Sequence, residues 1–293
     1  MLRSCDPQQS SPLPLIGQLA LGSRLARNIH QPVFIVFLAA WLTMIGACLL
    51  GLDPVRAWPY APQFLLFAAT AATLTGLARV LPWQNVLAAA GLIGASGAGL
   101  EILAYVTGLP FGARSPQLAG DHVALIAVWW LPLGWINILI SARGVARLTL
   151  RPWREIRFYG WWLILGSALL AATFDLAWQE LNTGLNSGLG PGVIRPLSFL
   201  LLKAGLAFGV MTLAAPWFID KHPSRYKQNP DFHPVILWMA FTILLAADYP
   251  SGPRRAATLC FFLASQAVLV LAIIYARAQR PPERQEGTAR AVG

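Results

Sequence analysis

The chain has 293 residues, of which 56% are hydrophobic and 12% charged, about half the charged share that is usual in soluble domains. This composition excludes a soluble globular protein and a disordered chain, and the 3 Cys residues give no support for a disulfide-rich secreted domain. The net charge is +10, but the Lys and Arg residues lie mainly between long apolar runs, which is typical of membrane proteins and not of nucleic-acid-binding proteins.

Apolar segments long enough to cross about 30 Å of hydrocarbon recur along the chain. They are residues 32–51, 61–81, 85–108, 121–141, 158–178, 196–218, 233–249 and 256–277. We therefore predict an all-α polytopic membrane helix bundle with about eight transmembrane helices. The seventh segment has a short uninterrupted apolar part, and as a re-entrant helix it would leave seven crossings. Residues 1–31 are predicted to be a cytoplasmic or interfacial lead-in, residues 32–277 the transmembrane domain, and residues 278–293 a disordered cytoplasmic tail.

The distribution of positive charge predicts the orientation of the bundle. If the N-terminus is cytoplasmic, 16 of the 22 Lys and Arg residues fall on the cytoplasmic side, 5 fall on the opposite side, and Lys203 lies within a span. Cytoplasmic loops are enriched in Lys and Arg, so both termini are predicted to be cytoplasmic, and the number of helices to be even. The arginine-rich loop 142–157 is interpreted either as an interfacial segment against anionic lipid or as a plain topogenic loop.

Ionisable side chains are rare inside the predicted spans and are therefore candidates for function. With the orientation above, Glu101, Asp175 and Lys203 all fall in the non-cytoplasmic half of their spans, and Asp248 falls at the end of the seventh. Glu101 follows Gly91, Gly94 and Ala98 at helical spacing, which predicts that it shares a face of small residues where helices approach closely. Asp175 similarly follows alanines on one face, so both carboxylates are expected to point into the bundle.

Structural interpretations of the same residues stay open. Glu101 and Lys203 lie at a similar depth and could form only a structural ion pair. If they touch, Glu101 is expected to be ionised, and Asp175 or a water molecule must then supply any proton. Trp129 and Trp130 belong either to an interfacial aromatic belt or to the wall of a pocket.

The segment that follows Glu101 is rich in residues that end helices. It contains Thr107, Gly108, Leu109, Pro110, Phe111 and Gly112 in succession. Two glycines and a proline stop the helix and predict that the chain folds back near the carboxylate, as a lid over a pocket would.

At these residues the sequence resembles the carotenoid biosynthesis membrane protein family, which includes prokaryotic carotenoid hydratases. The resemblance rests on Glu101 followed by the Thr107–Gly112 string, on Pro132-Leu133-Gly134-Trp135, and on the late aspartate of Ala171–Leu176, and it covers about residues 85–180. It implies a hydro-lyase of the bacterial-type inner (cell) membrane that adds water to a terminal carbon–carbon double bond of a long isoprenoid polyene. Such a reaction needs no cofactor and no metal, and the partners implied are the polyene, membrane lipid and other carotenoid-pathway enzymes.

The chemistry implied by this resemblance assigns roles to the candidate residues. A carboxyl group in apolar surroundings can keep its proton near neutral pH, so Glu101 is the candidate acid, and Asp175 is the candidate that orients the water and accepts its proton. The substrate-binding candidates are Tyr105, Thr107, Pro110, Phe111, Trp129, Trp130 and Lys203, the aromatic members stabilising the tertiary carbocation. Two other functions remain open: a proton-coupled membrane carrier, and a non-catalytic lipid- or carotenoid-binding member of the family.

Overall fold

A computed structural model describes residues 13–52, 58, 60–107, 121–154, 156–182, 194–219 and 232–247, together with the isolated residues 266, 269, 270 and 274. Every secondary-structure element in that part of the chain is a helix. The α-helices are α1 (Leu13–Leu49), α3 (Ala61–Ala78), α4 (Trp83–Thr107), α5 (Asp121–Thr149), α6 (Tyr159–Asn182), α7 (Ile194–Ala214) and α8 (His233–Ala247). Short 3-10 turns, η2 (Arg151–Trp153) and η3 (Ala215–Phe218), follow α5 and α7.

The helices confirm the all-α prediction for the described residues. Seven of the eight predicted apolar segments each overlap one of the seven α-helices. The eighth, residues 256–277, lies almost entirely outside the described residues. Within the described residues, four stretches are long and apolar enough to cross a membrane: Asn28–Leu49, Ala61–Ala78, Trp83–Leu103 and Leu200–Phe218. The apolar part of α8, His233–Leu244, is shorter. These helices indicate a membrane protein, while the number of crossings and their orientation stay predictions.

Two helix boundaries differ from the sequence-based expectation. Helix α1 begins at Leu13 and runs through Pro32, so most of the predicted lead-in is helical. Helix α5 ends at Thr149 and not near residue 141, because Val145 and Ala146 are buried in the bundle and extend its apolar face past the first arginines. A charged residue within the last turns of a helix is compatible with burial of the opposite face.

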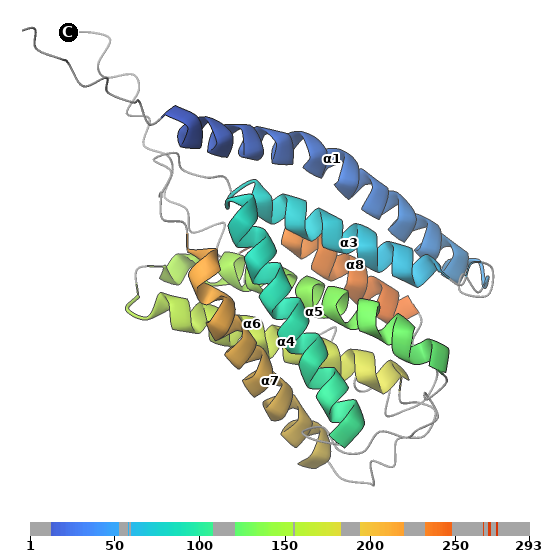
Figure 1. Ribbon diagram of the computed structural model, residues 1–293. Helices are drawn as coiled ribbons and strands as arrows, with labels where there is room; N and C mark the ends of the chain where they lie inside the picture. The colour runs from blue at the N-terminus through green and yellow to red at the C-terminus, as the bar shows by residue number, and fades with distance from the viewer. Residues whose placement is uncertain are drawn as a thin grey trace, which may run out of the picture.

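Helix α5 lies at the centre of the bundle, where it contacts α3, α4, α6 and α8 (Figure 1). The main apolar core is formed mainly by residues of α4, α5, α6, α7 and α8. A second core is formed by residues of α1, α3 and α8. The close approach of α4 to α5 requires Gly97, because a Cβ there would overlap the indole ring of Trp135 and lie 2.8 Å from its Cβ. This glycine therefore fixes how α4 and α5 are rotated about each other.

A buried polar cluster joins α3 to α5 away from the helix ends. The Asn137 amide donates to the Thr70 hydroxyl at 2.6 Å and to the Leu133 carbonyl at 3.0 Å, while its oxygen accepts from the Thr73 hydroxyl at 3.0 Å. Because all the polar groups of Asn137 find partners, this amide can be buried in an apolar bundle.

Helices that follow one another in the chain run in opposite directions, so the helix ends lie in two layers (Figure 1). At one end, Arg79 lies 3.4 Å from the His233 ring, and the Arg143 guanidinium lies 4.1 Å from the centre of the Phe218 ring. The ends of α3, α5 and α7 and the starts of α4, α6 and α8 share this layer. The opposite layer contains the ends of α4 and α6 and the start of α7, which carry the ionisable candidates.

Large apolar side chains cover much of the outside of the bundle. Exposed examples are Ile35 and Leu42 on α1, Phe67 on α3, Leu87 on α4, Leu169 on α6, and Leu201 and Leu213 on α7. An apolar exterior of this kind is unstable in water and suits a lipid environment.

Candidate functional site

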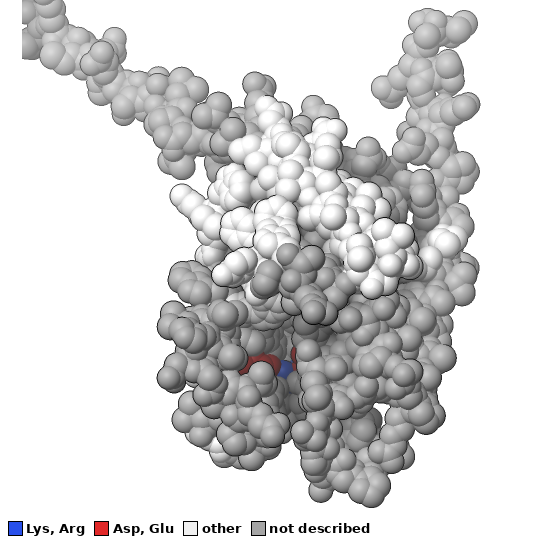
Figure 2. All heavy atoms as spheres, turned by 90° about the vertical axis from the view of Figure 1, so that its right-hand side faces the viewer, with Lys and Arg blue, Asp and Glu red and all other residues white. Residues whose placement is uncertain are grey.

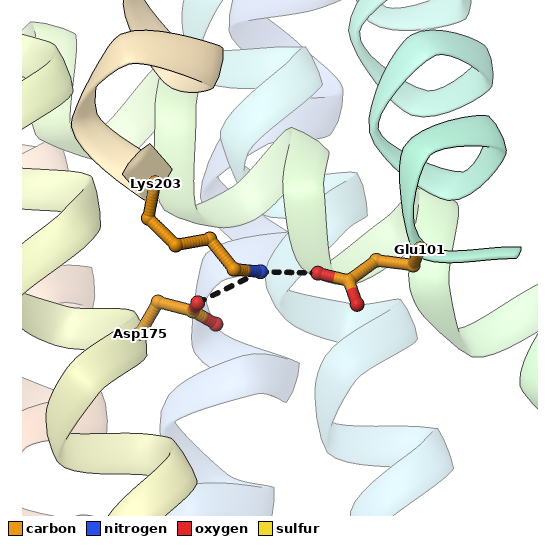
Figure 3. A network of polar contacts seen from close by, with 3 residues as sticks. All are labelled: Glu101, Asp175 and Lys203. Carbon is orange, nitrogen blue, oxygen red and sulfur yellow. Dashed lines mark hydrogen bonds and ion pairs between the residues drawn. The ribbon is translucent and has the colours of Figure 1, made fainter. Parts of the chain in front are cut away.

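Three ionisable side chains from three helices meet near one end of the bundle (Figure 3). The Lys203 ammonium, on α7, donates to Oε1 of Glu101 on α4 and lies 2.9 Å from Oδ2 of Asp175 on α6. The lysine stands between the two carboxylates, so that each acid interacts with the same cation. We call Glu101, Asp175 and Lys203 the triad.

The members of the triad differ in their access to the surroundings. The side chains of Lys203 and Glu101 are 2% and 7% exposed, whereas that of Asp175 is 23% exposed. Figure 2 shows acidic and basic atoms in a hollow of the face that lies at the right of Figure 1. Asp175 is therefore the member of the triad best placed to exchange a proton with the outside.

Small residues on two of the helices make room for the triad. On α6, Ala168, Ala171 and Ala172 are almost completely buried along the face that carries Asp175, as the sequence predicts. On α4, Gly94 and Ala98 share the buried face of Glu101, but Gly91 is exposed. Ten residues separate Gly91 from Glu101, so the two positions lie about 80° apart around a 3.6-residue helix, which explains the difference.

The predicted inward orientation of Glu101 and Asp175 agrees with these contacts, but the two carboxylates do not border an open groove. Lys203 fills the space between the carboxylates. An apolar groove of about 450 Å³ lies instead on the outer side of α4 and α7, lined by small and aliphatic residues such as Gly99, Leu103 and Gly209. Glu101 is two residues from both Gly99 and Leu103, about 200° around the helix, so it points away from this groove.

Trp135 belongs to the surroundings of the triad although it is not among the predicted site residues. The centre of its ring lies 5.4 Å from the Lys203 nitrogen, a cation–π distance, and the ring is seated against Gly97. The sequence signal that could have found it is the pairing of a glycine on α4 with a bulky aromatic residue on the following helix.

The other predicted substrate-binding residues are not brought to the triad by the described contacts. The Thr107 hydroxyl donates to the Leu103 carbonyl at 2.7 Å, within its own helix, and its side chain is exposed. Trp130 is half-buried. The side chains of Tyr105 and Trp129, and residues Pro110, Phe111 and Asp248, lie outside the described part of the chain.

The site offers acid–base chemistry in an apolar setting. With all three members charged, the triad has a net charge of −1, and one added proton makes it neutral. Within the described residues, no group of three or more His, Cys, Asp or Glu side chains is arranged to hold a metal ion. Comparison of the chain with protein-family models, with curated proteins and with solved structures finds no match.

Proposed function

We propose that the chain is a membrane-embedded hydratase that adds water to a terminal carbon–carbon double bond of a long isoprenoid polyene. The observation that carries the proposal is the triad, which places two carboxyl groups and one lysine inside an apolar helix bundle. Such groups are costly in a membrane protein and are kept where protons must be moved. The proposed setting is a bundle of eight spans with both termini in the cytoplasm of a bacterial-type inner (cell) membrane.

The contacts divide the two carboxyl groups between two roles. Glu101 is bound by Lys203 and almost fully buried, so it is proposed to remain a carboxylate. Asp175 is more exposed and is proposed to hold the exchangeable proton of the triad. This assignment exchanges the roles that the sequence alone favours, and it follows from the contact between Lys203 and Glu101.

The reaction then proceeds by protonation followed by addition of water. Asp175 gives its proton to the terminal alkene carbon, which leaves a tertiary carbocation on the neighbouring carbon. Water adds to that cation, and the proton that the water loses returns to the Asp175 carboxylate. The overall reaction joins one alkene and one water molecule to give one tertiary alcohol, and the triad ends in its starting state.

The test is product formation in cells that supply an acyclic polyene precursor. We expect the unmodified chain to produce a hydroxylated polyene, Asp175→Asn to lower the product at least 100-fold, as loss of an acid–base group does, and Glu101→Gln to lower it less. Glu286→Gln, in the polar C-terminal part of the sequence, is a matched control outside the triad. Full product from Asp175→Asn at equal protein abundance would remove Asp175 from the mechanism, and no product from the unmodified chain with any acyclic polyene would overturn the proposal.

One observation favours a second candidate, a proton-coupled carrier. A cation shared by two carboxylates on different helices can bind and release one proton as the helices move. Purified protein in liposomes would then show substrate-dependent proton uptake, abolished by Asp175→Asn, without chemical change of the substrate. Retention of a polyene with neither turnover nor proton movement would instead indicate a non-catalytic lipid- or carotenoid-binding protein.

A further inference from the structure

The turn between α5 and α6 presents aromatic and aliphatic side chains to the surroundings. It runs from Leu150 to Phe158 and includes η2. The large apolar side chains of the turn and of the first residues of α6 are about half exposed or more; they are Trp153, Ile156, Phe158, Trp161 and Trp162. Trp161 stacks on Phe208 of α7, but the protein leaves about half or more of each of these side chains uncovered, and only a partner outside the protein could bury the remainder.

The backbone of this turn is held in place by successive hydrogen bonds. The amide of Trp153 donates to the Leu150 carbonyl at 3.1 Å, that of Ile156 to Trp153 at 3.0 Å, and that of Tyr159 to Ile156 at 3.1 Å. The exposed side chains are consequently presented by an ordered backbone, which lowers the entropy lost when they bind a partner.

Phe158 has a backbone conformation that a phenylalanine rarely adopts. Its φ angle is 69°, in the left-handed region where a side chain is strained and glycine is favoured. The ring is 61% exposed, so packing inside the protein does not account for a phenylalanine at this position. Strain of this kind points to a use for the side chain outside the fold.

Positive charge surrounds the same side chains. Arg147, Arg154 and Arg157 are exposed, and the Arg157 guanidinium lies 5.0 Å from the centre of the Phe158 ring. The acidic side chains described on α4 and α6, Glu101 and Asp175, belong to the other layer of helix ends. One acid of the turn itself, Glu155, lies outside the described residues, and the sequence still leaves the turn with a net positive charge.

We propose that this turn binds the headgroup layer of an anionic membrane leaflet, with the aromatic rings in the interface and the arginines on the lipid phosphates. Aromatic side chains at the headgroup level and clustered Arg residues are the two features that hold protein segments at anionic bilayers. The surface lies in the opposite layer of helix ends from the triad and does not depend on the reaction proposed for it. The proposal gives Phe158, which has a positive φ angle, a function in membrane binding, whereas the distribution of positive charge in the sequence says nothing about this residue.

The experiment uses the full chain, purified in a mild detergent and titrated with phosphatidylglycerol or phosphatidylcholine while the unfolding temperature is measured. We expect phosphatidylglycerol to stabilise the protein at lower concentration, and added NaCl to reduce that preference. Arg154→Gln with Arg157→Gln should lower the preference roughly 25-fold, about fivefold for each arginine. The matched control, Arg254→Gln with Arg255→Gln, removes the same charge from a distant part of the sequence and should leave the preference unchanged.

A second variant separates lipid binding from folding. Phe158→Gly should raise the unfolding temperature in lipid-free detergent, because the strain is relieved, and should weaken the stabilisation by phosphatidylglycerol. If Phe158 has only a structural role, Phe158→Gly should instead lower the unfolding temperature in lipid-free detergent. The proposal is overturned if Phe158→Gly leaves the phosphatidylglycerol titration unchanged, or if the control pair loses as much preference as the arginines of the turn.

Discussion

The lysine of the triad gives the sharpest test of the arrangement. Lys203→Met keeps a flexible apolar stem of similar length and removes the cation that contacts Glu101 and Asp175. Two carboxyl groups are then left facing each other in an apolar environment without a counter-charge. Removing one partner of a buried ion pair costs about 3–5 kcal/mol of unfolding free energy, and Lys203, at 2% exposed, meets that condition.

Glu101→Gln should lower the unfolding free energy less than Lys203→Met does, because of the geometry of the triad. Glu101→Gln removes the carboxylate bound to Lys203, and Asp175, 2.9 Å from the lysine nitrogen, gives up its proton and replaces Glu101 as the counter-charge. The expected loss is about 1.5–3 kcal/mol, the contribution of one hydrogen bond to a charged group. The double variant should be no less stable than Lys203→Met alone, because it removes one of the two carboxylates that the lysine had neutralised.

The measurement is reversible unfolding in mixed detergent micelles, followed by far-ultraviolet circular dichroism, for the four members of this double-mutant cycle. Lys227→Met, in a polar segment of the sequence, is the matched control and should change the unfolding free energy by less than about 0.5 kcal/mol. If the effects of Glu101→Gln and Lys203→Met add to within about 0.5 kcal/mol, the two side chains do not interact and the proposed site is wrong.

Two further predictions concern the packing that supports the triad, measured by the same unfolding assay. Gly97→Ala forces a methyl group into the Trp135 ring and should lower the unfolding free energy by about 1–3 kcal/mol. Gly99→Ala, whose added methyl group would have nothing within 4 Å, should leave the unfolding free energy unchanged or raise it by up to about 1 kcal/mol. Equal effects of the two substitutions would refute the close approach of α4 and α5. Asn137→Leu removes the hydrogen bonds to α3, including that from Thr73, and should cost about 1–2 kcal/mol; a stabilised variant would show that this polar cluster does not hold the helices together.

The depth of the ionisable residues could be predicted from the sequence, but their pairing could not. Each apolar run fixes how far a residue such as Glu101 or Lys203 lies along its helix, and alternating helix directions bring these depths into one layer. The rotation of one helix about another depends on contacts between distant residues, such as Gly97 against Trp135, which no local pattern contains. The sequence therefore left open whether Lys203 would touch Glu101, and it gave no indication that the lysine would also reach Asp175.

Helix starts were predicted well near Pro82 and Pro234, but helix boundaries were predicted wrongly at Pro32 and where charged residues were taken as the end of a helix. The start of α4 after Pro82 and that of α8 at His233 and Pro234 agree with the expected spans to within two residues. The arginines at 143 and 147 do not end α5, because only one side of a helix at a membrane boundary must be apolar. Pro32 does not begin α1, since a proline within a membrane helix is tolerated when its neighbours satisfy the freed carbonyl.

The shared lysine also decides how the two carboxyl groups can be told apart experimentally. If the exchangeable proton is on Asp175, Asp175→Asn removes that proton and leaves the buried Lys203–Glu101 pair intact, so the fold should be nearly unchanged while activity is lost. If the proton is on Glu101, the same substitution removes the counter-charge of Lys203, Glu101 must give up its proton to replace it, and the unfolding free energy should fall by about 1.5–3 kcal/mol, the contribution of one hydrogen bond to a charged group. Unfolding free energy and activity of Asp175→Asn, measured on one preparation, therefore distinguish the two assignments, since only the first combines loss of activity with an unchanged fold.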